Sequence, residues 1–300
     1  MSAAPLIDIV LPYWGAPEHL YTAVASVREQ HDPAWRLTVI DDAYPSDDVP
    51  RHFADLDDDR VRYLRNDSNL GITANFQRAA DLAEAPLTVF LGSDDRLEPD
   101  YVARIRQAAD AHSDVDVFAP AVRVIDEQGR RYEPLADRVK RILTPRTTAG
   151  PVRFDGEAMV STLSRGNWLY WPSLAIRTKR VKSIPFRLDL PIILDMAFLL
   201  DIAFDGGSLL YLNGPPMFEY RRHRSSLSQK AIIDGVRFRD EARFHHEIAQ
   251  RAQRAGWRSA AFWARLRPSS RLHAAVSLPK VVGARDGSGT VSALSNAFGR

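Results

Sequence analysis

The sequence predicts an α/β fold in which helices flank a mostly parallel, Rossmann-like sheet. Two observations support this class. Short apolar runs alternate with segments of helical spacing through the first third of the chain, and turn-forming polar residues separate them. Two of these runs also end directly in paired aspartates. Ligands of such sheets bind beyond the carboxyl ends of the strands, so the aspartates mark the expected site.

The expected elements follow one another in alternating order. Residues 6–11 form an apolar run closed by Pro12, which predicts a buried strand, and apolar residues recur at helical spacing over 17–30. The same reasoning predicts further strands and one further helix, namely strands at 36–40, 61–64 and 87–91 and a helix at 72–83. This alternation indicates parallel pairing of the strands.

The second half of the chain is less regular. A strand is expected at 116–125, and the polar stretch 126–150 has the composition of a flexible loop, which could serve as a lid. Residues 237–285 contain 11 arginines and lysines against three acidic residues. The last fifteen residues are rich in glycine, serine and alanine, and we expect them to be disordered.

Composition excludes several classes of protein. The formal net charge of +2 gives no whole-chain case for nucleic-acid binding, and the absence of cysteine removes disulfides and thiolate chemistry. The amino terminus lacks a basic leader, and the longest apolar stretch, 188–204, is interrupted by three aspartates and a proline. We therefore expect neither a signal peptide nor a membrane-spanning helix, and a cytoplasmic location.

Ser93-Asp94-Asp95 follows a strongly apolar strand, which would hold both carboxylates rigidly. Aspartates after a strand are common turn formers, so this pair alone is a weak signal. Asp41-Asp42 occupies the same position on an earlier strand, however, and neighbouring strand ends converge on one crevice. Carboxylate oxygens are the ligands that hard divalent cations prefer, and such a cation can neutralise a diphosphate.

Four ordered motifs give the sequence its resemblance to a known family. They are Ile9-Val10-Leu11-Pro12-Tyr13-Trp14, Val39-Ile40-Asp41-Asp42, Asn69-Leu70-Gly71 through Asn75, and Phe90-Leu91-Gly92-Ser93-Asp94-Asp95. In order and spacing they resemble the motifs of family 2 inverting glycosyltransferases of the GT-A fold. The likeness continues more weakly through Trp171-Pro172-Ser173, Leu194-Asp195 and Tyr220 to His223, and so covers roughly residues 6 to 228.

The resemblance implies which residues bind a nucleotide-sugar donor. Pro12, Trp14 and Asp42 match the positions that grip the nucleotide base, and Gly71 and Asn75 belong to a further donor-binding motif. Asp94 would contact the ribose or the diphosphate. Asp95 would bind the divalent metal, Mn²⁺ or Mg²⁺. Many members carry an aspartate where this chain has Gly92, so one ribose contact is missing or replaced.

Asp195 matches the family's general base, which removes the proton from the acceptor hydroxyl. A single carboxylate on the face opposite the diphosphate accounts for inversion by one displacement. Members often have Glu-Asp at this point, where this chain has Leu194 before Asp195. Two alternatives stay open: Asp195 caps the helix that follows it, or Asp189 or Asp201 is the base instead.

Further candidates lie in the second half. His223 could ligate the metal or contact the diphosphate, with Arg222 or Arg224 supplying positive charge, unless this run is a basic surface loop. Trp168, Tyr170 and Trp171 could form a platform for an acceptor sugar or lipid, although such aromatics are more often core. The apolar residues between the carboxy-terminal arginines suggest a segment that lies on an anionic membrane or packs against the domain.

These observations divide the chain into four parts. They are a nucleotide-sugar-binding half (1–115), an acceptor-binding and catalytic half (116–230), a basic helical extension (231–285) and a disordered tail (286–300). The expected activity is metal-assisted, inverting transfer from a nucleoside-diphosphate sugar, with a UDP-sugar favoured, to a glycan or lipid-linked acceptor. The expected location is cytoplasmic, with the basic extension touching the inner face of the membrane.

Three other classes of protein share features with this sequence. Haloacid-dehalogenase-type phosphatases need two aspartates separated by one residue, and Asp42-Ala43-Tyr44 lacks this arrangement. Nucleotidyltransferases need a glycine-rich loop after the first strand, and residues 12–18 contain only Gly15. A glycosyltransferase-like domain that binds nucleotide or glycan without turnover is the remaining alternative, because Gly92 and Leu194 depart from the family pattern.

Overall fold

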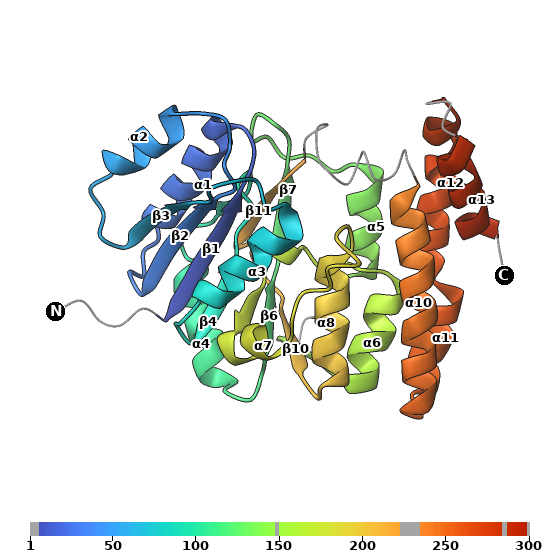
Figure 1. The fold of residues 1–300 in the computed structure, drawn as a ribbon. Coiled ribbons are helices and arrows are strands. Elements are labelled where there is room, and N and C mark those ends of the chain that lie inside the picture. Colours follow the sequence, from blue (N-terminus) through green and yellow to red (C-terminus); the bar gives the residue numbers. More distant parts are fainter. Residues whose placement is uncertain (1–5, 148–149, 223–234, 284–286, 299–300) are drawn as a thin grey trace.

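The computed structural model describes residues 6–147, 150–222, 235–283 and 287–298. A sheet of eight strands runs through the molecule in the order β3-β2-β1-β4-β9-β6-β10-β8 (Figure 1). The strands are β1 (Ile7–Tyr13), β2 (Trp35–Asp41), β3 (Val61–Arg65), β4 (Leu87–Phe90), β6 (Val117–Pro120), β8 (Val152–Asp155), β9 (Ala175–Arg177) and β10 (Ser208–Leu212). The mostly parallel α/β class expected from the sequence is confirmed.

Strands β3, β2, β1 and β4 are parallel neighbours, so their carboxyl ends lie at one edge of the sheet. The order of strands along the chain reverses between β1 and β4, which is where ligands bind in doubly wound sheets. The loops after these two strands meet there, since a Cβ on Gly15 would lie 3.9 Å from Ser93 Oγ. Strand β9 runs antiparallel to both β4 and β6 and joins the two halves of the chain in one sheet.

A second sheet of three strands lies beside the main one. Its order is β5-β11-β7, with bounds Arg96–Leu97, Phe218–Arg221 and Val122–Ile125. The single strand expected at 116–125 is thus two strands, β6 and β7, which belong to different sheets. Residue Ala121 separates them and lets the chain pass from one sheet to the other. Strand β11 is consequently carried to the residues that follow β4.

Helices cover both faces of the main sheet. Alternate residues of β1 face opposite sides: Ile9 packs in the cluster with helix α1 (Pro17–Arg28), and Val10 packs in the cluster with helix α3 (Ile72–Leu82). Helices on the first side also include α2 (Asp48–Ala54) and α4 (Tyr101–Ala111). The second side is covered by α6 (Gly156–Arg165), α7 (Thr178–Ser183) and α8 (Leu194–Phe204), with the short 3₁₀ helix η1 (Trp171–Ser173) nearby.

The expected loop at 126–150 contains a helix, α5 (Leu135–Leu143). Charged and apolar residues alternate in α5, and the polar, proline-containing stretch around it has the composition of a loop. Two of its polar side chains nevertheless point inward: Asp137 is buried, and the Lys140 ammonium donates a hydrogen bond to the Leu169 carbonyl. The inner face of α5 is therefore held by polar contacts instead of an apolar stripe.

The carboxy-terminal extension is helical and packs in two tiers (Figure 1). Helices α10 (Val236–Arg254) and α11 (Arg258–Leu266) contribute Ile248 and Ala260 to the cluster that contains α6 and α8. Helices α12 (Pro268–Gly283) and α13 (Gly287–Phe298) form a separate small cluster with Phe238. Residues 287–298 are therefore a helix, contrary to the disorder expected, because small side chains such as Ala293 pack closely against α12.

No helix in the described part of the chain is both long enough and apolar enough to cross a membrane.

Asp8 ties the start of the sheet together. Its buried carboxylate accepts two hydrogen bonds from Arg36, at 2.9 and 3.0 Å, and two more from the backbone amides of Glu84 and Ala85, at 2.6 and 2.7 Å. Strands β1 and β2 and the turn before β4 thus share one anion. Removing that anion would leave the two backbone amides without an acceptor and Arg36 with only its ion pair to the exposed Glu84.

We expect Asp8→Ala to lower the free energy of unfolding by about 3 kcal/mol, the size typical of breaking a buried ion pair. Urea unfolding followed by circular dichroism measures this change. The matched control is Asp57→Ala, at an exposed aspartate without hydrogen bonds among the described residues, which should change stability by about 0.5 kcal/mol or less. Equal effects of the two substitutions would show that Asp8 does not hold these elements together.

Candidate active site

Asp95 lies at the carboxyl end of β4 and is 1% exposed. Its Oδ1 accepts a hydrogen bond of 2.8 Å from the backbone amide of Arg221 in β11. Its Oδ2 is buried and has no hydrogen-bond partner among the described residues. Burial, together with the nearby charge of Asp94, raises the pKa of Asp95 well above its usual value. One carboxylate oxygen is therefore held in place, and the other lacks the hydrogen bond or cation that a buried carboxylate oxygen usually has.

The arginine at position 221 fixes this end of β4. Its guanidinium donates to three backbone carbonyls, those of Asp94 at 2.7 Å and of Asp126 and Glu127 at 3.0 Å each. Burial lowers the pKa of Arg221 from its usual value. Because three of its five N–H donors are used within the protein and its side chain is buried, Arg221 organises the aspartate loop instead of presenting charge to a ligand.

Gly92 leaves the space that the Asp95 carboxylate occupies. A Cβ at position 92 would lie 2.4 Å from Asp95 Oδ2 and 3.2 Å from Asp94 Oδ1. Any side chain here would force Asp95 to another rotamer. Gly92 departs from the family pattern, and its lack of a side chain lets the Asp95 carboxylate turn back toward β4.

Asp42 organises a loop at the end of β2. Its Oδ1 accepts hydrogen bonds from Asn66 Nδ2 at 2.6 Å and from the backbone amide of Leu70 at 2.8 Å, and its Oδ2 accepts one from the amide of Gly71 at 2.9 Å. Asn75 supports the arrangement from α3 by donating to the Ile40 carbonyl at 3.1 Å. Three predicted donor-binding residues are therefore brought together in one polar network.

The backbone is strained at Ala43, between the Asp42 network and the aromatic pair Tyr44 and Trp14. Ala43 has φ of 59°, which is unusual for a residue other than glycine. The buried Asp41 carboxylate holds this turn by accepting a hydrogen bond from the Tyr44 amide at 2.7 Å. Tyr44 then meets Trp14 edge to face, with ring centroids 5.4 Å apart. Trp14 follows β1 and is 51% exposed, so one aromatic surface is available to a ligand.

Arg222 is paired inside the protein. Its Nε and Nη2 donate to the two oxygens of Asp137 at 3.0 and 2.8 Å, and Tyr170 Oη donates to the same carboxylate at 2.9 Å. The Tyr170 ring lies 5.0 Å from that of Tyr220, and Tyr220 interacts electrostatically with Asp94 and Asp95. Arg222 therefore joins α5 to the aspartate site, and its predicted contact with the donor stays a prediction.

Asp195 occupies the first turn of α8 and is half-buried. The N-cap residue of that helix is Ile193, and there is no side-chain cap, so Asp195 is not a capping residue. Its carboxylate makes no hydrogen bond or ion pair among the described residues. Lys140 interacts electrostatically with Asp195 and Asp137, and burial lowers the pKa of Lys140 to about 8. A charge network thus links Asp195 to α5.

The two fallback bases are paired. Asp189 is bound by Arg187 at 2.9 and 3.1 Å, and Asp201 is bound by Arg251. Neither carboxylate is as available to a substrate as that of Asp195. The structure therefore favours Asp195 among the three candidates.

Trp168 and Trp171 lie in the core. Trp171 stacks on Phe90 with centroids 5.4 Å apart, and Trp168 meets Tyr211 edge to face at 5.3 Å. Both tryptophans are less than 10% exposed, which agrees with the core alternative. Trp168 also borders a pocket, described below.

The described residues contain no group of three or more histidine, aspartate or glutamate side chains arranged to hold a metal ion. His223, predicted as a ligand, lies outside the described residues. Magnesium in nucleotide sites is commonly held by one or two carboxylates together with phosphate oxygens and water. The unpartnered Oδ2 of Asp95, beside Asp94, fits a site of that kind.

Three residues of the site were not anticipated from the sequence: Arg221, Asp137 and Lys140. Their importance depends on contacts between segments far apart in the chain. Arg221 belongs to the basic run Arg221-Arg222-His223-Arg224, and nothing local distinguishes it from Arg222. Asp137 and Lys140 stand three residues apart, which places them on one face if the segment is helical.

Comparison with known proteins agrees with this geometry. Residues 8–166 match the model of the family described as glycosyl transferase family 2. The putative colanic acid biosynthesis glycosyl transferase WcaA of Escherichia coli K12 is 30% identical over 100 residues, which are 33% of this chain and 36% of that protein. The putative glycosyltransferase EpsH of Bacillus subtilis 168 is 24% identical over 231 residues, which are 75% and 63% of the two chains. The chain thus spans less than two thirds of the length of these relatives.

A solved structure shows the same fold. The complex of S. aureus TarS residues 1–349 with UDP-GlcNAc superimposes with a TM-score of 0.66 over 93% of this chain and 79% of that one, at 14% sequence identity. The GT-A architecture expected from the sequence motifs is therefore confirmed. Because the family match covers more than half of the 300 residues, this chain belongs to glycosyl transferase family 2.

Proposed function

We propose that the protein transfers a sugar from a nucleoside-diphosphate sugar to a hydroxyl group of a glycan or lipid-linked acceptor, with inversion at the anomeric carbon. The observation that carries this proposal is the state of Asp95, with one oxygen fixed by the Arg221 amide and the other buried without a partner. The site lies at the β1–β4 switch point, where a doubly wound sheet binds nucleotides.

The donor would lie across the carboxyl ends of β2, β1 and β4. Trp14 offers an exposed ring next to Pro12 for the base, and the Asp42 loop, including Gly71 and Asn75, forms the neighbouring wall. A uridine nucleotide is the favoured base, a choice supported by the UDP-GlcNAc and UDP complexes of TarS. The diphosphate would then reach Asp94 and Asp95.

Asp94 and Asp95 would hold Mn²⁺ or Mg²⁺, with His223 as a further candidate ligand. When bound there, the cation supplies positive charge that stabilises the departing diphosphate. The protein's part is to keep the Asp95 carboxylate preorganised, which the Arg221 amide and the space at Gly92 both do. Holding the ligand in advance avoids reorganisation during the reaction.

Asp195 would act as general base. As the acceptor oxygen forms its bond to the anomeric carbon, the bond from that carbon to the diphosphate breaks, and the hydroxyl proton passes to the Asp195 carboxylate. Among the described residues this carboxylate has no hydrogen-bond or ion-pair partner, so it is free to accept the proton. Its attachment to the first turn of α8 fixes its direction.

The carboxy-terminal helices would rest on an anionic membrane when the acceptor is lipid-linked. Exposed apolar side chains follow one another at helical spacing on α12 and α13: Leu272, Val276, Val291, Leu294 and Phe298. Arginines are frequent in the neighbouring helices, and this combination suits the lipid interface. The first tier, α10 and α11, is packed on the domain instead.

We expect Asp195→Asn to lower the rate of nucleoside diphosphate release by at least about 100-fold, because a general base contributes about 10²–10⁴-fold. The rate is measured with the best substrate among UDP-, GDP- and dTDP-sugars, in the presence of Mn²⁺. The affinity for UDP should stay within about twofold. Asp110→Asn, at an exposed aspartate of α4, is the control and should keep the full rate. A non-catalytic domain would release no diphosphate even when unmodified.

Gly92→Ala tests the space that Asp95 needs. The added Cβ would displace the carboxylate from the Arg221 amide, so we expect UDP affinity in the presence of Mn²⁺ to fall about tenfold or more. Calorimetric titration with UDP measures it. Gly287→Ala, where a Cβ meets nothing within 4 Å, should bind UDP normally. Unchanged affinity in the Gly92 variant would show that the observed Asp95 rotamer is not the one that binds the donor.

A further inference from the structure

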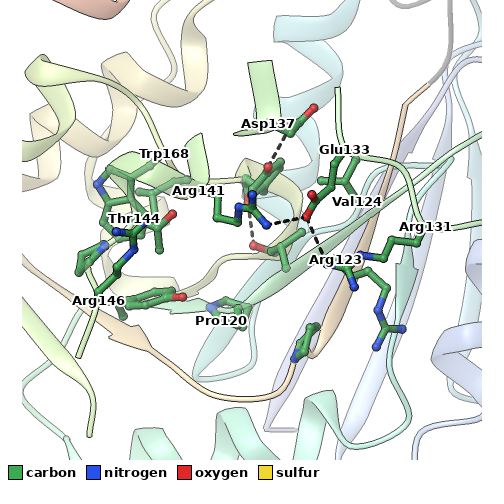
Figure 2. Close-up of a pocket in the computed structure, with 18 residues that line it drawn as sticks. Pro120, Arg123, Val124, Arg131, Glu133, Asp137, Arg141, Thr144, Arg146 and Trp168 are labelled. Atoms are coloured by element: carbon green, nitrogen blue, oxygen red, sulfur yellow. Dashed lines mark hydrogen bonds and ion pairs between the residues drawn. The ribbon is translucent and has the colours of Figure 1, made fainter. Parts of the chain in front are cut away.

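A pocket of about 560 Å³ lies between α5, β7 and the segment leading into η1 (Figure 2). Its size is in the range of small-molecule sites. Apolar side chains such as Pro120, Val122 and Val124 form part of its wall, and Trp168 and Tyr170 add aromatic surface. Trp14, Asp42, Asp94 and Asp95 do not line it, so it is distinct from the donor crevice.

The charged residues of the pocket are mostly arginines. Four of them line it, namely Arg123, Arg131, Arg141 and Arg146, against two carboxylates, Glu133 and Asp137. Figure 2 shows Arg141 reaching toward Glu133, with a dashed line that marks their ion pair. The lining therefore carries a formal excess of two positive charges.

The carboxylates are already occupied. Glu133 Oε1 accepts from both Arg131, at 3.3 Å, and Arg141, at 3.1 Å. Asp137 is neutralised by Arg222, as described above. Arg141 uses one of its five N–H donors in this way, and Arg146 has no hydrogen bond or ion pair among the described residues. Donors for an oxyanion are thus present in the pocket and unused.

The pocket wall is shared with the active site. Asp137 and Tyr170 line the pocket, and the Asp137 carboxylate accepts hydrogen bonds from both Tyr170 and Arg222. Lys140, one helical turn beyond Asp137, connects the same wall electrostatically to Asp195. Lys140 also donates to the carbonyl of Leu169, which lines the pocket, so it connects the pocket wall to the proposed base.

We propose that this pocket binds an oxyanion, phosphate or carboxylate, carried by the acceptor glycan. Guanidinium groups recognise both anions through paired N–H donors, and an apolar wall beside them suits an attached sugar ring. The inference rests on the proposed function, since it names the class of acceptor for the same reaction. It assigns acceptor recognition to Arg141 and Arg146.

The test compares three sugars of similar size that differ in charge: glucose 6-phosphate, glucuronate and glucose. Their affinities for the full chain are measured by ligand-observed NMR titration at constant ionic strength. Arg141→Gln and Arg146→Gln remove the guanidinium groups. The matched controls are Arg51→Gln, which like Arg141 is exposed and paired with a carboxylate, and Arg62→Gln, which like Arg146 is exposed and unpaired among the described residues.

We expect at least one of the two anionic sugars to bind the unmodified chain about tenfold or more tightly than glucose. Each pocket substitution should remove about tenfold of that affinity, and neither control should change it. The anion that binds more tightly identifies the group on the acceptor. Equal binding of all three sugars, no binding of either anion, or anion binding that survives both pocket substitutions would overturn the proposal.

The proposed function is read separately, from UDP binding and diphosphate release by the unmodified chain without acceptor. If these fail while the anion still binds at Arg141 and Arg146, the pocket is a binding site and the catalytic assignment is wrong. If they succeed and the anion does not bind, the acceptor class is wrong and the donor reaction stands.

Discussion

The hydrogen bond from the Arg221 amide to Asp95 joins the two sheets at the point where the candidate active site lies. It holds one oxygen of a buried carboxylate, and the Arg221 guanidinium fixes the backbone of Asp94 from the same strand. Without β11 in this place the aspartates after β4 would be an ordinary turn. The position of β11 in turn depends on the chain leaving the main sheet between β6 and β7, since β11 pairs with β7 in parallel.

Two networks position the rest of the site around that bond. On the donor side, the Asp42 carboxylate accepts hydrogen bonds from the loop that leads into α3. The strained turn at Ala43 and the exposed Trp14 lie beside this loop. On the acceptor side, Asp137 accepts hydrogen bonds from Arg222 and Tyr170, and the ammonium group of Lys140 interacts electrostatically with Asp195. Both networks consist of buried charges with partners, which makes them costly to disturb and therefore specific in geometry.

Strands β1, β2 and β4 could be predicted because each is mostly apolar, as expected for strands buried on both faces. Strand β3 is a half-exposed edge strand and was predicted from its alternating apolar residues. The site residues after them, from Trp14 to Asp95, were found from motifs at the strand ends. Helix α5 and the split between β6 and β7 could not be predicted in this way. The apolar residues of α5 do recur at helical spacing, at Leu135, Val139, Ile142 and Leu143, but this short run lies within a long polar stretch. No local pattern indicates that two consecutive apolar pieces enter different sheets. Arg221 was missed because its partners are more than 90 residues away.

We propose that the unpartnered Oδ2 of Asp95 binds a metal ion that also binds the donor diphosphate. Electron paramagnetic resonance of Mn²⁺, titrated with the protein and UDP, tests it most directly, since free and bound Mn²⁺ give different spectra. The account predicts that UDP increases Mn²⁺ binding to the unmodified chain and that Asp95→Asn abolishes this increase while the protein stays folded. An Asp95→Asn protein that binds Mn²⁺ and UDP together as tightly as the unmodified one would contradict it.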